Sequence, residues 1–183
     1  QFMAQRKSTV EEAWPGDIVG LPDNGIFKIG DTLTEGDMLH FRGLPSFSPE
    51  LFKYIENDDP MKSKQFQKGL EQLMNEGVAQ LFVNQFNNRR IVGTVGQLQF
   101  EVIQYRLEHE YNARCRWEPV HLHKACWIEA DSEEELERFK KRKYQYMAKD
   151  IEGRDVFLAD SGYVLSMAQQ DFEHVKFHFT SEF

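Results

Sequence analysis

The fold is decided between residues 78 and 107, which read Val78-Ala79-Gln80-Leu81-Phe82-Val83, a turn at Asn87-Asn88, and then Ile91-Val92-Gly93-Thr94-Val95-Gly96. Both apolar runs are short and rich in β-branched or aromatic residues, which is typical of strands joined by a tight turn. After Gly96 the apolar residues recur at helical spacing, so we expect them to face the core; they are Leu98, Val102, Ile103 and Leu107. This stretch predicts a strand, a turn, a second strand and a helix.

The flanking residues complete a strand–helix–strand–strand–helix–strand order. Leu51 to Glu56 predicts a strand, and Asp59-Pro60 predicts a helix start, with Asp as the cap and Pro at the first helical position. One apolar stripe follows on that helix, which we expect Gly77 to end; its residues are Phe66, Leu70, Leu73 and Met74. With Ala113 to Trp117 as the last strand, residues 45–119 predict a ferredoxin-like unit.

The same order recurs over residues 120–183. His121 to Glu129 predicts a strand, and Ser132-Glu133-Glu134-Glu135 is a capping box that opens a helix running to about Lys143. The remaining expected elements are strands at Tyr144 to Met147, Val156 to Ala159 and Val175 to Phe179, with a short helix around Val164 to Ala168. The fold class is therefore expected to be α+β. Residues 45–183 would contain two tandem ferredoxin-like (βαββαβ) halves, 45–119 and 120–183.

Residues 1–44 have a different pattern, with short apolar runs between turns. Ile18 to Leu21 and Ile26 to Ile29 predict strands, joined by a hairpin turn at Asp23-Asn24-Gly25. So few strands cannot close a barrel, and we therefore expect residues 1–44 to be the trailing piece of a β-domain whose beginning is absent. The start at Gln1, without an initiator methionine or a secretory signal, is also what we expect of an excised fragment.

Composition narrows the class of protein. The chain has 183 residues, 40% hydrophobic and 28% charged, and no apolar run approaches the ~18–20 residues that span a bilayer. Cys115 and Cys126 are its only cysteines, which favours a reducing, cytoplasmic setting over a disulfide framework. The formal charge of −8 argues against a general, salt-driven hold on nucleic acid, so any RNA contact must be local.

No motif in the chain predicts catalysis. A nucleotide site needs a glycine-rich loop ending in Gly-Lys-Ser/Thr, and Lys7-Ser8 has no upstream glycines. Four residues have side chains that could bind zinc: Cys115, His121, His123 and Cys126. Their spacing fits no standard zinc-site template. Two inert buried thiols and a pair of histidines on an edge strand explain the same residues equally well. We therefore expect no catalytic, cofactor or metal residue in this chain.

Two basic clusters remain as candidate contacts. Lys140-Lys141-Arg142-Lys143 ends a helix that begins with three glutamates, so a favourable placement in the helix dipole accounts for it. Arg89-Arg90 follows the Asn87-Asn88 turn, and two guanidiniums on an exposed hairpin tip can reach phosphates without the whole protein being basic. This pair is either a solvated turn or a contact with RNA or with another protein.

Several stretches stand in a specific order and spacing over residues 10–112: Val10 to Ile18, Ile29 to Thr34, Phe47 to Phe52, Gln67 to Leu73, Glu76 to Val78, Ile91 to Phe100, and Arg106-Leu107 with Glu110-Tyr111-Asn112. Together they resemble the bacterial peptide chain release factor 3 family of translational GTPases. From 113 to 183 the likeness is looser, with Gln169 and Phe177-His178 near the end.

The resemblance implies an intact cytoplasmic protein that begins with a GTPase domain, which binds GTP and Mg. It also implies that residues 1–44 are the last strands of a β-barrel second domain and that residues 45–183 are the third domain. It implies binding to rRNA and ribosomal proteins, contact with the GTPase domain of the same polypeptide, and dissociation of class-one release factors from the ribosome. The GTP-contacting motifs map to nothing in this chain, so no catalytic residue carries over. Arg89 and Arg90 are the candidate ribosome contact by exposure alone.

Three alternatives remain open at this point. The first is the middle of elongation factor G or of a ribosomal protection protein, which share the order of barrel and ferredoxin-like domain. The second is a ferredoxin-like enzyme of the acylphosphatase type, for which Asn87 to Arg90 supplies an Asn and an Arg but not the phosphate-cradling glycines. The third is a regulatory small-molecule binder with tandem ferredoxin-like units.

Overall fold

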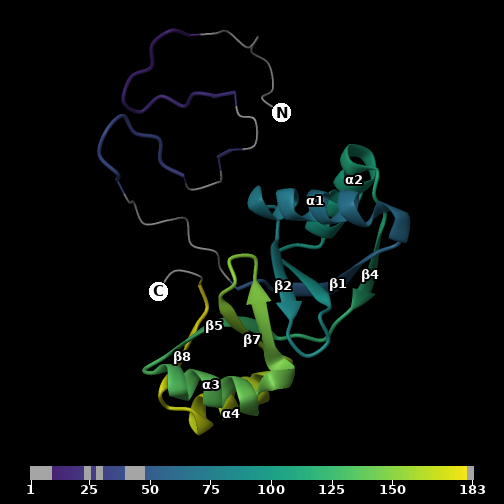
Figure 1. The fold of residues 1–183 in the computed structure, drawn as a ribbon, viewed down its shortest axis with the longest axis vertical. Helices are drawn as coiled ribbons and strands as arrows, with labels where there is room; N and C mark the ends of the chain where they lie inside the picture. Colours follow the sequence, from purple (N-terminus) through teal and green to yellow (C-terminus); the bar gives the residue numbers. More distant parts are fainter. Residues whose placement is uncertain (1–9, 23–25, 28–30, 40–47, 181–183) are drawn as a thin grey trace.

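A computed structural model describes residues 10–22, 26–27, 31–39 and 48–180 (Figure 1). In the described residues before 48 no strand is formed, and Ile18 is 96% exposed. The expectation of a strand at Ile18 to Leu21 is therefore wrong for this structure, because no barrel strands are present there for the segment to pair with. The expected hairpin turn at Asp23-Asn24-Gly25 lies outside the described residues.

The rest of the chain contains eight strands, four α-helices and two short 3-10 turns, η1 and η2, within the described residues. In chain order they are β1 (Leu51–Asn57), η1 (Pro60–Lys62), α1 (Ser63–Asn75), β2 (Gln80–Asn84), β3 (Arg90–Thr94), α2 (Leu98–Tyr111), β4 (Cys115–Pro119), β5 (Lys124–Ala130), α3 (Glu133–Arg142), η2 (Tyr144–Tyr146), β6 (Met147–Asp150), β7 (Asp155–Ala159), α4 (Gly162–Asp171) and β8 (Val175–His178). Two consecutive βαββαβ units were predicted, and this order confirms them.

All eight strands form a single sheet in the order β4-β1-β3-β2-β6-β7-β5-β8. The first four have the arrangement of one ferredoxin-like unit, and the last four repeat it in mirror order. The units meet at an antiparallel seam between β2 and β6, where Phe82 is opposite Asp150 and Asn84 is opposite Ala148. Each unit thus covers one edge strand of the other.

The four helices cover one face of this sheet. Alternation along the strands places Val83 and Lys149 on that face at the seam, and one helix-side core lies in each unit. The opposite, helix-free face carries a third core that draws on both units; its buried residues are Phe52, Phe82, Ile91, Ala125, Trp127, Ala148, Val156 and Leu158. Phe82 on β2 and Trp127 on β5 have ring centroids 6.2 Å apart although two strands separate them in the sheet, which requires this face to be concave here.

Local signals start and stop the helices as expected. The Asp59 carboxylate accepts the N–H of Met61 at the start of η1, and Ser132 Oγ accepts the N–H of Glu135 at the start of α3. The predicted stripe of α1 is buried, with Leu73 fully excluded from solvent. Asn112, in the left-handed region at φ 51°, ends α2.

Two expectations within the units are wrong. Tyr144 to Met147 is not a strand: residues 144–146 form η2, whose turn is closed by the N–H of Tyr146 on the carbonyl of Lys143, and β6 begins only at Met147. On α2, Leu98 and Val102 do not face the core and are 67% and 39% exposed. The core face is formed by Phe100, Ile103 and Leu107 instead.

No helix in the described ranges is long and apolar enough to cross a membrane.

Candidate functional site

The loop between β2 and β3 is built on the side chain of Asn84. Its Oδ1 accepts the N–H of Phe86 at 2.8 Å and that of Asn87 at 3.2 Å, and its carbonyl accepts the N–H of Asn88. Asn88 has a positive φ of 56°, which asparagine tolerates better than most residues. The predicted turn at Asn87-Asn88 is therefore present, and it fixes the direction in which the two following arginines leave the loop.

Arg89 is held by two carboxylates and a ring. Its Nη2 donates to Glu56 Oε1 at 2.6 Å and to Glu118, and its guanidinium carbon lies 3.7 Å from the centroid of the Tyr54 ring. Arg116 also donates to Glu56, at 2.8 Å. Hydrogen bonds from Arg116 and then Arg89 lower the pKa of Glu56. The Arg89 charge is balanced inside the first unit.

Arg90 points to the other side of the sheet. Side chains alternate along a strand, so Arg89 shares the helix-free face with Ile91, whereas Arg90 lies on the helix side opposite Val83. The two guanidiniums that were expected to act together are thus separated by the sheet. Arg90 is half-buried and makes no ion pair within the described part of the chain.

The tip of this hairpin meets the end of α3 from the second unit. The Tyr144 hydroxyl donates to the Gln85 carbonyl at 3.0 Å, and the Gln85 N–H donates to the Met147 carbonyl at 2.8 Å. Phe86 and Tyr144 form an edge-to-face pair with centroids 5.8 Å apart, and both rings remain about half exposed. The structure therefore brings the residues after the second basic cluster against the loop that carries the first.

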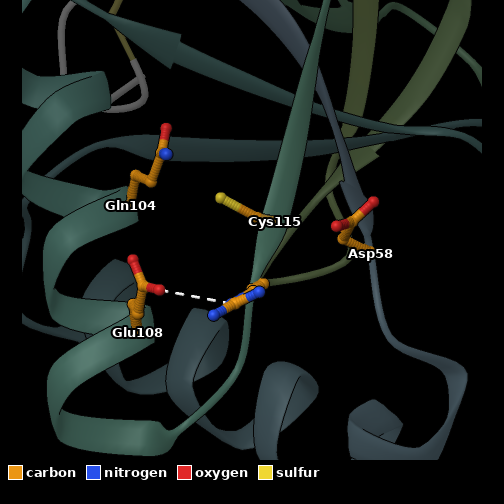
Figure 2. Close-up of a pocket in the computed structure, with 5 residues that line it drawn as sticks. Asp58, Gln104, Glu108 and Cys115 are labelled. Carbon is orange, nitrogen blue, oxygen red and sulfur yellow. Dashed lines mark ion pairs between the residues drawn. The ribbon is translucent and has the colours of Figure 1, made fainter.

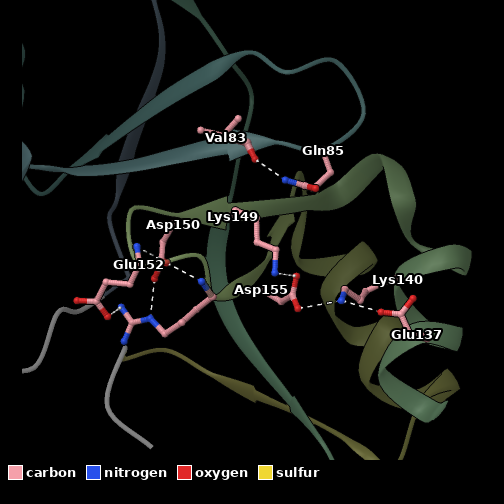
Figure 3. Close-up of polar contacts among 9 residues, drawn as sticks. Val83, Gln85, Glu137, Lys140, Lys149, Asp150, Glu152 and Asp155 are labelled. Atoms are coloured by element: carbon pink, nitrogen blue, oxygen red, sulfur yellow. Dashed lines mark hydrogen bonds and ion pairs between the residues drawn. The ribbon is translucent and has the colours of Figure 1, made fainter. Parts of the chain in front are cut away.

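Within the second cluster the four cations differ in their partners. Lys140 pairs with Glu137 at 2.9 Å and Asp155 at 3.0 Å, and Lys143 faces Asp171 at 3.6 Å. Asp155 also binds Lys149, which neighbours Val83 across the seam (Figure 3). Lys141 and Arg142 are exposed. The acidic first turn and basic last turn of α3 agree with the helix-dipole interpretation.

Comparison with protein families supplies the identity. The model for the C-terminal domain of class II release factor RF3 matches residues 41–169, well over half of the chain. The chain belongs to the class II release factor RF3 family. A model for elongation factor G domain 2 matches residues 1–36. The chain thus carries an RF3 C-terminal domain, which is part of a factor of translation termination, preceded by a remnant of the barrel domain that elongation factor G also has.

This result narrows the alternatives that the sequence left open. The resemblance to release factor 3 is confirmed, since the ferredoxin-like part matches the RF3 model. RF3 proteins are GTPases that bind GTP and act on the ribosome, and neither matched region is a GTPase domain. The acylphosphatase alternative also lacks its geometry, because Arg89 is turned onto Glu56 and Glu118 rather than toward a backbone cradle.

A small recess of about 210 Å³ lies between α2 and β4 of the RF3 domain (Figure 2). It is lined by Asp58, Gln104, Glu108, Arg114 and Cys115. Arg114 is already paired with Glu108 at 3.2 Å, and burial raises the pKa of Cys115 to about 11. A protonated thiol beside carboxylates is a poor nucleophile.

The candidate zinc residues of the RF3 domain do not converge. In the described ranges, no three His, Cys, Asp or Glu side chains lie close enough together to hold a metal ion. Cys126 is buried under α3 and α4, and burial raises its pKa to about 12. The histidines near the end contact carboxylates of the neighbouring strand region, with His174 at 3.2 Å from Asp131 and His178 at 3.3 Å from Glu129.

The aromatic pair at the junction and the separation of the two arginines were not predicted from the sequence. Phe86 and Tyr144 are 58 positions apart in the chain, so no local pattern links them. The opposite directions of Arg89 and Arg90 could have been found, because two adjacent residues at the entry of a strand must point to opposite faces.

Proposed function

We propose that this chain is the ribosome-binding C-terminal region of a termination GTPase that promotes dissociation of class-one release factors from the ribosome. The observation that carries the proposal is the RF3 C-terminal match over residues 41–169. Within the whole polypeptide, GTP and Mg are bound by a GTPase domain, and this region transmits the ribosome contact to it. The protein acts in the cytoplasm.

We further propose that residues 1–44 are the last strands of the barrel domain and that 45–183 form the third domain, with halves 45–119 and 120–183. Support comes from the boundary between the two family matches, which falls between residues 36 and 41.

The ribosome contact is proposed to include the β2–β3 loop, with Arg90 as its charged residue and Arg89 as the residue that fixes the strand. Arg90 is the better phosphate ligand because its charge is not balanced by an ion pair among the described residues, unlike that of Arg89. The exposed rings of Phe86 and Tyr144 beside the loop add a surface on which an RNA base could stack.

The test compares Arg90→Glu with Arg138→Glu in the whole polypeptide. Arg138 is 65% exposed in its side chain, and among the residues that the structure describes its ion-pair partner is Glu135 on the same helix, so it is a matched control for charge reversal. Arg90→Glu should weaken sedimentation with purified ribosomes several-fold and reduce the salt slope of binding by about one. It should also slow GTP-dependent dissociation of a labelled class-one release factor.

Arg89→Glu is not a useful variant, because it would place a third carboxylate beside Glu56 and Glu118 and unfold the edge of the sheet. Equal ribosome binding by the wild type, Arg90→Glu and Arg138→Glu would remove Arg90 from the contact. A wild-type protein that neither sediments with ribosomes nor affects class-one factors would overturn the function itself.

A further inference from the structure

Helix α2 is apolar on two opposite faces. Phe100, Ile103 and Leu107 are buried against the sheet and α1. Leu98, Val102 and Tyr105 recur at intervals of four and three residues on the opposite side, where they are 67%, 39% and 62% exposed. We call these last three residues, with His109 one turn further on, the α2 stripe.

The stripe is continuous and ordered. The rings of Tyr105 and His109 are stacked with centroids 4.0 Å apart and an interplanar angle of 20°. His109 Nδ1 lies 2.8 Å from the Tyr105 carbonyl, which holds the imidazole in that stack. Val95, 68% exposed, extends the apolar surface just before the helix begins.

Helix α1, which belongs to the same helix layer, does not have a second apolar face. The outward residues of α1 are all polar and exposed: Lys64, Gln67, Lys68 and Glu71. A helix with one apolar face is what packing on a sheet requires, and a second contiguous apolar face marks an interaction surface. Packing in the core therefore does not account for the exposed apolar side chains of the α2 stripe.

Charges beside the stripe restrict what can cover it. Glu101 and Glu108 lie along one flank, and Arg106 on the other is neutralised by Glu110 at 2.7 Å and by Glu76. Arg114 reaches Glu108 at 3.2 Å. The rim thus carries four carboxylates against two guanidiniums, and its net charge is negative.

We propose that the α2 stripe is a docking surface for a basic protein segment that inserts an apolar side chain between lysines and arginines. The inference rests on the proposed ribosome binding, and it names the partner there as a ribosomal protein rather than rRNA. A negative rim repels phosphates and attracts Lys and Arg.

The other possible occupants fit the rim less well. Residues 1–44 of the same chain contain seven acidic and four basic side chains, so they would meet the rim with like charge. A second copy would place two identical acidic rims against each other across a two-fold axis. Only a basic partner satisfies both the stripe and its rim.

The first experiment measures ribosome binding of the full chain as wild type and as two double variants. Leu98→Ser with Tyr105→Ser removes two of the three apolar side chains of the stripe. Met61→Ser with Tyr163→Ser is the control, since these residues are 88% and 74% exposed and lie elsewhere. The stripe variant should bind about tenfold more weakly or worse, with an unchanged melting temperature, and the control should bind as the wild type does.

Charge reversal at Glu101 distinguishes protein from RNA. Glu101→Lys should weaken ribosome binding if the partner is basic, and should strengthen it if the stripe faces phosphates. A photo-cross-linking amino acid at Val102 then identifies the partner on purified ribosomes. The expected product is a cross-link to a Lys/Arg-rich segment of one ribosomal protein.

The outcomes of these experiments distinguish a failure of the docking inference from a failure of the proposed function. Cross-links to rRNA, to residues 1–44 or to a second copy would overturn the docking inference, as would full binding by the stripe variant while the wild type binds. Failure of the wild type to bind ribosomes at all would overturn the proposed function and the docking inference with it.

Discussion

The indole Nε1 of Trp127 donates a 2.9 Å hydrogen bond to Oδ2 of Asp150, across the strand that separates β5 from β6. Asp150 is also the residue opposite Phe82 at the seam between the two units. Its carboxylate accepts three further hydrogen bonds, from Arg154 Nε at 2.7 Å, the Arg154 N–H at 2.9 Å and the Glu152 N–H at 3.0 Å. One buried carboxylate thus closes the β6–β7 turn and anchors the largest side chain of the shared core.

Asp150→Ala should destabilise the chain by about 2–4 kcal/mol, because it leaves the buried Trp127 N–H without its acceptor and removes the hydrogen bond from Arg154 Nε. Urea unfolding followed by circular dichroism measures the loss. Glu152→Ala is the control, since that carboxylate is 64% exposed and its ion pair with Arg154 should contribute less than about 0.5 kcal/mol. Equal stabilities of the two variants would contradict this role of Asp150.

Gly93→Ala should also destabilise the fold, by about 1–3 kcal/mol. A Cβ at this position of β3 would lie 2.5 Å from Cγ and 2.8 Å from Cβ of Pro49, and the rigid proline ring cannot turn away. Gly162→Ala at the first position of α4 is the matched control, because its Cβ would meet only the His123 ring at 3.6 Å. That variant should be neutral or slightly more stable. Thermal unfolding of the two variants and the wild type measures this difference in stability.

The buried thiol of Cys126 should make stability fall at high pH. Burial raises its pKa to about 12, whereas an unfolded thiol has a pKa of about 8.5. A raised pKa stabilises the fold below the unfolded value, and that contribution is lost as the pH rises through the folded value. Between pH 8 and pH 10 the wild type should therefore lose about 2 kcal/mol more than Cys126→Ala does, since only the unfolded wild type gains a thiolate. Parallel urea titrations at both pH values test this; an identical pH dependence of the two proteins would refute it.

Local sequence signals predicted most of the secondary structure of this fold. Contacts between residues far apart in the chain could not be predicted from the sequence. The Asp59 and Ser132 caps, the buried stripe of α1 and the order of the elements all depend on residues within a few positions of each other. The β2–β6 seam depends on which edge strand of the first unit pairs with which edge strand of the second, and the sequence of neither strand predicts this pairing. The end of the barrel was inferred correctly as a family feature, although its strands are not formed in the described residues.

Helix α2 shows how periodicity can mislead. Leu98, Val102 and Tyr105 have the same helical spacing as Phe100, Ile103 and Leu107, so the pattern alone allows either face to be buried. The burial of Phe100 against Trp117, with ring centroids 5.1 Å apart, decides between them. The rejected face is the one that we infer to be a docking surface.

The two units should unfold as one. Each contributes side chains to the helix-free core, with Phe52 and Phe82 from the first and Trp127 and Leu158 from the second, and the β2–β6 seam pairs an edge strand of each. Separating them would expose this core and two unpaired strand edges, so neither unit is expected to persist when the other is lost.

Two variants, each with a single tryptophan, report the unfolding of one unit at a time. Trp14→Phe with Trp127→Phe leaves Trp117 as the probe of the first unit, and Trp14→Phe with Trp117→Phe leaves Trp127 as the probe of the second. Within each variant, the midpoint and slope of urea unfolding by tryptophan fluorescence should coincide with those measured by far-ultraviolet circular dichroism, because one transition then exposes both units. A fluorescence transition that precedes the dichroism change in either variant, with a plateau between them, would show that the seam does not couple the units.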